Sequence, residues 1–136
     1  MTKGWTWAPR PAKKVAFKVP VCIREKIEKQ AGRLIESELR PRHIISKPQA
    51  NHHNYIVDIH SKWHRHYFYF RARYRCQVPH RLSEFFDHGF ARLECRGGNV
   101  FNLSYMRHTG RWWKLYNRLS LEECLEAIRK QAHFLP

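Results

Sequence analysis

Alternate residues between Tyr67 and Arg75 carry side chains that can bind a polyanion. Read with the period of two that a β-strand imposes, one side of the segment presents Tyr67, Tyr69, Arg71, Arg73 and Arg75. No acidic residue interrupts this row. Aromatic rings can stack on nucleic-acid bases, and guanidinium groups can neutralise phosphates. The row therefore predicts a strand that contacts nucleic acid.

The opposite side of this segment is apolar, and three later segments divide in the same way. The expected inward positions are Phe68, Phe70, Ala72, Tyr74, Cys76, Ala91, Leu93, Cys95, Phe101, Leu103, Tyr105, Trp113 and Leu115. The expected outward positions on the later segments are Arg92, Glu94, Arg96, Asn102, Ser104, Met106, His108, Trp112, Lys114 and Tyr116. Solvated faces usually mix the two signs of charge, so a basic, aromatic face with a single acid indicates an anionic partner.

A second concentration of cations and tryptophans surrounds the His108-Thr109-Gly110 turn. Its members are Arg107, Arg111, Trp112, Trp113 and Lys114. Such a group could clamp a phosphate beside a stacking ring. It could equally be a hairpin tip whose Trp113 belongs to the core, and both interpretations stay open.

Three histidines near the same strand could perform general acid–base cleavage of a phosphodiester. They are His60, His64 and His66, and Lys62, Arg65 and Arg71 could hold the phosphate. The same histidines could ligate a metal with Asp58 as a carboxylate ligand. Neither spacing is specific to its chemistry, so a ribonuclease remains an alternative, and we assign no catalytic residue, metal or cofactor.

Helices at both ends of the chain are expected to support these segments. Apolar residues fall on one stripe of a helix predicted from Pro20 to Leu39, because Arg40 precedes a proline that disfavours continuation. Ser120-Leu121-Glu122-Glu123 is a capping box, which predicts a last helix ending near Gln131. Leu82-Ser-Glu-Phe-Phe is expected to form one helical turn, with Phe85 and Phe86 as apolar plugs.

The segments between the two helices are expected to be strands, and Gly97-Gly98-Asn99 is a strong hairpin turn. The expected strands span residues 54–60, 66–76, 90–96, 100–107 and 111–117. Strands grouped in this way predict an α+β fold: a mainly antiparallel five-stranded sheet with an N-terminal and a C-terminal helix packed on one face.

Composition bounds the class of protein. The 136 residues favour a single domain over 15–136 preceded by a flexible basic arm over 1–14. A formal charge of +15 indicates a polyanionic partner. No run of apolar residues could span a membrane or serve as a signal peptide, and the four cysteines lack metal-site spacing. We therefore expect a cytoplasmic protein with reduced thiols and no membrane partner.

The last third of the chain resembles an uncharacterised family of small bacterial proteins. The resemblance is carried by the Tyr105–Trp113 hairpin, the Leu119–Leu125 helix start and the closing Phe134-Leu135-Pro136. It implies a bacterial or phage-related cytosolic setting. As a domain-of-unknown-function family, it supplies no activity and no catalytic residue.

These observations predict a non-enzymatic module that binds RNA or another single-stranded nucleic acid rather than duplex DNA. A small toxin-like ribonuclease, or an adaptor or inhibitor that docks an acidic protein, is the alternative. The predicted nucleic-acid-binding residues are Tyr67, Tyr69, Arg71, Arg73, Arg75, Arg92, Arg96, Arg107, Arg111, Trp112, Lys114 and Tyr116.

Overall fold

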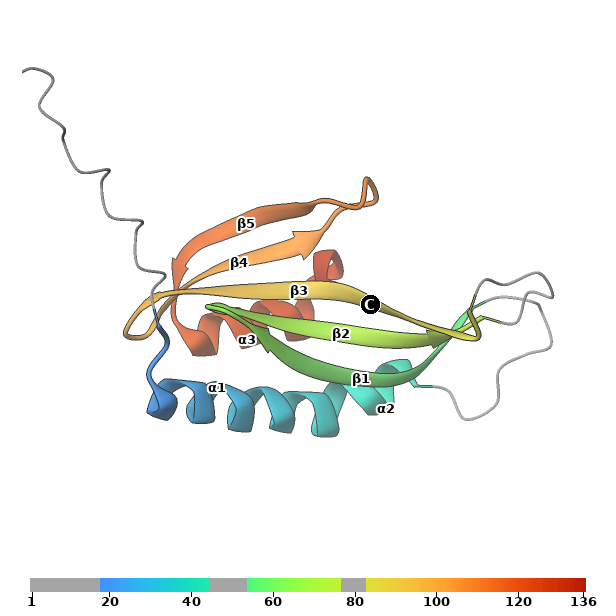
Figure 1. Cartoon of the computed structure of the whole chain (residues 1–136), viewed down its shortest axis with the longest axis horizontal. Helices are drawn as coiled ribbons and strands as arrows, with labels where there is room; N and C mark the ends of the chain where they lie inside the picture. Colours follow the sequence, from blue (N-terminus) through green and yellow to red (C-terminus); the bar gives the residue numbers. More distant parts are fainter. Residues whose placement is uncertain (1–17, 45–53, 77–82) are drawn as a thin grey trace, which may run out of the picture.

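A computed structural model describes residues 18–44, 54–76 and 83–136 of the chain. Within these ranges five strands follow one long helical segment and precede a second helix (Figure 1). In chain order the elements are α1 (Val21–Leu34), a π-helical segment (Ile35–Leu39), α2 (Arg40–His43), β1 (Tyr55–His64), β2 (Tyr67–Arg75), β3 (Phe85–Gly97), β4 (Val100–Met106), β5 (Trp112–Leu119), α3 (Leu121–Lys130) and a short 3₁₀ turn (Ala132–Phe134).

The strands form one antiparallel sheet in the order β1-β2-β3-β4-β5, so each strand pairs with the next one along the chain. Figure 1 shows the five strands side by side, with α1 running along β1 and α3 behind the sheet. This arrangement confirms the predicted α+β fold with a helix at each end of the sheet sequence.

The core lies between the helices and one face of the sheet. Its helical members include Ile27, Ala31, Leu34, Leu121 and Cys124, all buried. Its sheet members include Phe68, Phe70, Ala72, Leu93, Cys95, Phe101 and Leu103, which are the predicted inward residues of β2, β3 and β4. Burial of these large side chains stabilises the fold by about 1.5–3 kcal/mol for each one fully buried.

The first helical segment does not stop at Leu39 as predicted. It continues through Pro41 and ends at His43. The residues before the proline form a π-helical turn, in which the Arg40 N–H bonds to the Ile35 carbonyl. Pro41 has no N–H to donate and its ring crowds the preceding turn of an α-helix. The wider turn accommodates the ring, and α2 then continues to His43.

Strands β1 and β3 extend four and five residues beyond the predicted ends of their strands, and both extensions change the sheet surface. Strand β1 continues to His64 and meets β2 through a two-residue turn in which Arg65 has φ of +56°. Strand β3 begins at Phe85, so the helical turn predicted over Leu82–Phe86 is wrong at Phe85 and Phe86. The sheet therefore includes Lys62, His64 and Asp87, which the predicted strands left out.

The C-terminal elements follow their sequence signals closely. Ser120 accepts a hydrogen bond from the Glu123 N–H, and the Glu123 carboxylate accepts one from the Ser120 N–H. This capping box starts α3 at the predicted position.

Some predicted segments lie wholly or partly outside the described residues, namely the basic arm over 1–14, residues 45–53 of a connection predicted over 41–53, and residues 77–82. In the part of the chain that is described, no helix combines the length and the apolar character needed to cross a membrane.

Candidate nucleic-acid interface

The sheet face turned away from α1 and α3 carries most of the predicted binding residues, and we call it the open face. Its members on β2, β3 and β5 are Tyr67, Tyr69, Arg71, Arg73, Arg75, Arg92, Glu94, Arg96, Trp112 and Lys114. Strand β1 adds Asp58, His60, Lys62 and His64 opposite the β2 row. Among the described residues, no helix covers this face, since both long helices pack on the other one.

Four side chains in the middle of the open face form a stacking cluster: Tyr67, Tyr69, Arg92 and Trp112. The guanidinium carbon of Arg92 lies 4.5 Å from the ring centre of Tyr67 and 5.0 Å from that of Trp112. The ring centres of Tyr69 and Trp112 are 5.6 Å apart. Each cation–π contact stabilises such an arrangement by about 0.5–1 kcal/mol at an exposed site, so the cluster is preorganised.

Gly89 makes room for this cluster. The indole of Trp112 reaches from β5 to lie over Gly89 of β3, and a Cβ atom added at Gly89 would lie 3.0 Å from Trp112 Cζ2. Any other residue at this position would push the ring away. The sequence did not mark Gly89 as part of the site, because its role depends on a side chain two strands away.

Arg71 and Arg92 have no acidic partner. All eleven Asp and Glu residues of the chain lie within the described ranges, and none of their carboxylates comes within 4.0 Å of either guanidinium. The Nε atom of each arginine is also buried and has no hydrogen-bond partner among the described residues. Both guanidiniums therefore keep their capacity to bind an anion.

Arg73 and Arg75 differ, because each forms an ion pair with a residue of the β3 region. Arg73 donates two hydrogen bonds to Asp87, of 2.9 and 3.3 Å, and Arg75 lies 3.0 Å from Glu84. The hydrogen bond from Arg73 lowers the pKa of Asp87. The predicted row unopposed by acids is therefore wrong for these two arginines, because β3 starts early enough to bring Asp87 opposite Arg73.

Glu94 is a mostly buried acid of the open face. Asn102 Nδ2 donates to its Oε1 at 3.0 Å, whereas His66 Nε2, the Tyr67 hydroxyl and an Arg96 nitrogen lie 3.4, 3.5 and 3.8 Å from its Oε2. Burial alone would raise the pKa of Glu94, but these hydrogen bonds and the nearby cations lower it overall. Glu94 is therefore ionised at neutral pH.

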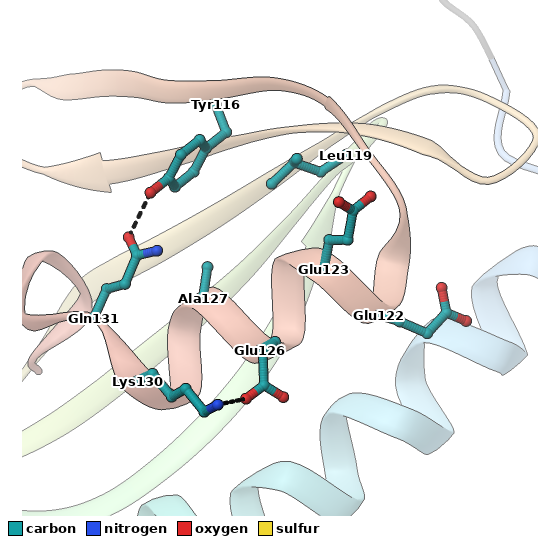
Figure 2. Close-up of a pocket in the computed structure, with 8 residues that line it drawn as sticks. All are labelled: Tyr116, Leu119, Glu122, Glu123, Glu126, Ala127, Lys130 and Gln131. Carbon is teal, nitrogen blue, oxygen red and sulfur yellow. Dashed lines mark hydrogen bonds and ion pairs between the residues drawn. The ribbon is translucent and has the colours of Figure 1, made fainter.

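Tyr116 does not lie on the open face as predicted. The register of β5 shifts at Leu115, so Tyr116 pairs with Leu103 on the helix side of the sheet. Figure 2 shows its ring turned toward α3, where the hydroxyl donates a hydrogen bond of 2.9 Å to Gln131.

Arg107 and Arg111 belong to the tip of the β4–β5 hairpin. Arg107 lies 4.7 Å from the ring centre of Trp113, which pairs with the inward-facing Tyr105 on the side of β5 opposite Trp112. Trp113 is 51% exposed, so it is not the core residue that one interpretation expected. The tip therefore does not gather its cations and both tryptophans into one clamp on the open face.

A groove of about 540 Å³ lies on the other side of the sheet, between β5 and α3 (Figure 2). Its wall carries Glu122, Glu123 and Glu126, which are occupied by the capping box and by ion pairs with Lys26, Arg129 and Lys130. These carboxylates are already paired, and the groove lies on the face of the sheet opposite the stacking cluster, so it is separate from the nucleic-acid candidate.

The three candidate histidines do not converge on one point. His60 and His64 both lie on the open face, but they are four positions apart along β1, a distance of about 13 Å. His66 lies in the β1–β2 turn against Tyr67, and its Nε2 is directed at Glu94. In the described ranges, no three His, Cys, Asp or Glu side chains lie close enough together to hold a metal ion.

Comparison with known proteins identifies a family for this chain. No curated protein sequence and no solved structure matches the chain. A protein family described as "Domain of unknown function (DUF3024)" matches residues 19–136, from the residue before Pro20 to the end of the sequence. The match includes both helices and all five strands, and so extends well beyond the C-terminal third whose resemblance the sequence suggested. The chain therefore belongs to the DUF3024 family.

Proposed function

We propose that this protein binds RNA or another single-stranded nucleic acid, in preference to duplex DNA, through the open face of its sheet. One observation carries the proposal: Arg92 is held between the rings of Tyr67 and Trp112 without an acidic partner, on a face that no described helix covers. Arg71 and Lys114 add positive charge on the same face.

In the proposed mode of binding, different side chains provide the stacking on bases and the contacts with phosphates. Bases stack on the exposed sides of Trp112 and Tyr69, and each stacked base contributes about 1–3 kcal/mol. Phosphates contact Arg71 and Arg92, and each contact adds a sequence-independent, salt-sensitive term. Stacking on a side chain requires an unstacked base, which a loop or a single strand offers and a rigid duplex does not.

The partner is thus a cytoplasmic RNA or single strand, and no membrane is involved. All four cysteines are free thiols, which is consistent with a reducing compartment. The separation of His60 from His64 gives no support to a histidine-based ribonuclease, so we propose binding without cleavage.

Titration of fluorescent oligonucleotides at several salt concentrations tests the proposal. We expect single-stranded RNA to bind more tightly than a duplex of the same sequence. The variant Arg92→Gln should weaken binding at least tenfold, because it removes both a phosphate contact and the cation that orders the cluster. Arg33→Gln, at an exposed position of α1 on the helix side, removes the same charge and should have little effect.

Three outcomes would contradict the proposal. Equal affinity for duplex and single strand would exclude the stacking mode. RNA degradation in the presence of a chelator, lost in His64→Ala or His66→Ala, would indicate a ribonuclease. Absence of nucleic-acid binding combined with capture of an acidic protein after nuclease treatment would indicate an adaptor or inhibitor.

A further inference from the structure

A polar cavity of about 730 Å³ opens at the end of the open face formed by β3, β4 and β5. Its lining includes Glu94, Asn102, Arg96, Lys114 and Arg118. The cavity adjoins the stacking cluster, because the Tyr67 hydroxyl that approaches Glu94 belongs to the ring under Arg92. A strand bound across the cluster would therefore reach this cavity within one or two nucleotides.

The backbone around the cavity is held in an uncommon conformation. Arg118 has φ of +58°, a left-handed value that a non-glycine residue rarely adopts. Its N–H donates a hydrogen bond of 3.1 Å to Asn102 Oδ1, and Asn102 is buried. A strained residue that is fixed by a buried partner is common at binding sites.

The polar groups in the cavity favour a ligand with both hydrogen-bond donors and negative charge. Glu94 can only accept hydrogen bonds. Oε1 accepts a hydrogen bond of 3.0 Å from Asn102, which leaves that oxygen a second lone pair, and every contact to Oε2 is 3.4 Å or longer, so both oxygens can take an incoming donor. Arg96, Lys114 and Arg118 supply three positive charges against one carboxylate, which excludes a cationic ligand and suits a phosphate.

Among the four bases of RNA, guanine best matches a carboxylate. Its Watson–Crick edge presents the adjacent donors N1–H and N2–H₂. On adenine and cytosine the donor amino group stands beside an acceptor nitrogen, and on uracil the single N–H stands between two carbonyls. Only guanine therefore offers an ionised carboxylate two donors side by side.

We propose that this cavity binds one guanine nucleotide of the bound strand, with the base on Glu94 and the phosphate among Arg96, Lys114 and Arg118. The inference rests on the proposed function, since it assigns a base preference to the strand that the open face holds. It gives the site a specificity that stacking and phosphate contacts alone do not provide.

Two oligonucleotides of equal length test this inference: a dodecamer of uridine, and the same strand with one central guanosine. We expect the guanosine strand to bind the wild-type protein about tenfold more tightly, the discrimination of one bidentate base contact. Glu94→Gln should abolish this preference, so that the two strands bind the variant with equal affinity. Glu84→Gln, which makes the same change outside the cavity, should keep the preference.

A second pair of probes keeps the test independent of any structural effect of Glu94→Gln. GMP should bind the wild-type protein more tightly than guanosine, and Arg118→Asn should reduce that difference, because asparagine tolerates the left-handed backbone but removes one of the three charges around the phosphate. Equal binding of both oligonucleotides by the wild-type protein would overturn the inference and leave the proposed function standing. Binding of neither oligonucleotide would refute the proposed function, and the inference with it.

Discussion

Arginines on a single strand differ in what they can offer a phosphate. Arg71 and Arg73 are neighbours on the same side of β2, but Arg73 is paired with Asp87 and Arg71 has no acidic partner. A phosphate that binds Arg73 must compete with a carboxylate held by two hydrogen bonds. We therefore expect nearby arginines to contribute unequally.

Variants that each remove one charged side chain measure how much each arginine contributes to RNA affinity. Arg71→Gln should weaken RNA binding and lower the slope of log affinity against log salt by about 0.7, the value for one phosphate contact on a single strand. Arg73→Gln is the matched control and should change little. Asp87→Asn should free Arg73, tighten binding and raise the slope by about 0.7. Fluorescence anisotropy between 50 and about 300 mM salt gives all three slopes.

Equal losses in Arg71→Gln and Arg73→Gln would contradict the distinction. Acid provides an independent check, because Arg73 lowers the pKa of Asp87 in the folded protein. The stabilisation from this pair is present above the unfolded carboxyl pKa of about 3.9 and is lost as the pH falls through the lower folded value. The stability of Asp87→Asn should therefore depend less on pH in that range than the stability of the wild type.

The four thiols should differ sharply in reactivity. Burial raises the pKa of Cys95 to about 11 and that of Cys124 to about 12, whereas Cys22 is exposed. At pH 8 only about a thousandth or less of the two buried thiols would be the reactive thiolate. Iodoacetamide followed by mass spectrometry should label Cys22 first and the buried pair only after unfolding. Rapid labelling of Cys124 in the folded protein would show that α3 separates readily from the sheet.

At the scale of elements, a β-bulge in β3 decides which of its side chains face outward. Between Phe70 and Arg71 the pairing of β2 with β3 shifts by one residue, so Phe90 and Ala91 are both buried. Before the bulge the odd-numbered residues of β3 face outward, and after it the even-numbered ones do. Both Asp87 and Arg92 consequently lie on the open face.

Gly89 lies beside this bulge in β3, and substituting it tests how β3 positions the Trp112 indole of β5. Gly89→Ala should displace the Trp112 indole by a few tenths of an ångström or more, since the new methyl group would lie 3.0 Å from it. We expect RNA affinity to fall about threefold, a part of one stacked base, with little loss of stability because Trp112 lies at the surface. The indole N–H resonance of Trp112 in an NMR spectrum reports the displacement. An unchanged resonance with unchanged affinity would show that the stacking cluster does not depend on the absence of a side chain at residue 89.

The period of the sequence explains which elements could be predicted. Strand β2 follows the alternation throughout, and the capping box starts α3 at the predicted residue. In β4 the outward Asn102 and Ser104 are buried as well as their inward neighbours. The errors fall where one residue is added, because a period of two read across a bulge assigns every later side chain to the wrong face. Tyr116 was misplaced for this reason, and Asp87 was missed because Phe85 and Phe86 resemble a helical turn as much as a strand start.

At the scale of the whole molecule, a net charge of +15 opposes folding. Ion pairs such as Arg40 with Asp58, Arg73 with Asp87 and Arg75 with Glu84 offset part of the repulsion. A formal surplus of fifteen positive charges remains, and Arg71 and Arg92 are among the cations without an acidic partner. Binding of a polyanion would relieve this repulsion as well as add contacts.

Salt should therefore stabilise the free protein. Raising sodium chloride from 50 to about 500 mM should increase the free energy of unfolding by about 1 kcal/mol, or the melting temperature by about 4 °C, because screening weakens repulsion between like charges. Heparin at low salt should have a larger effect. A decrease in melting temperature with salt would indicate that attractive ion pairs outweigh the excess positive charge.

The extra residue at Phe90 also decides which genetic changes the family can tolerate. Exchanging one side chain on β3 alters one point of the surface. Losing the codon for Phe90 alone would remove the bulge, and Gly89 and Ala91 would then alternate as ordinary neighbours, so Asp87 and Arg92 would keep the face that they have now. Losing a codon away from the bulge would send the side chains on one side of the deletion to the opposite face. We expect relatives to vary widely in the residue types of this strand, and to be one residue shorter only at the bulge. An alignment that places the gap elsewhere in β3 would assign the arginines of such a relative to the wrong face.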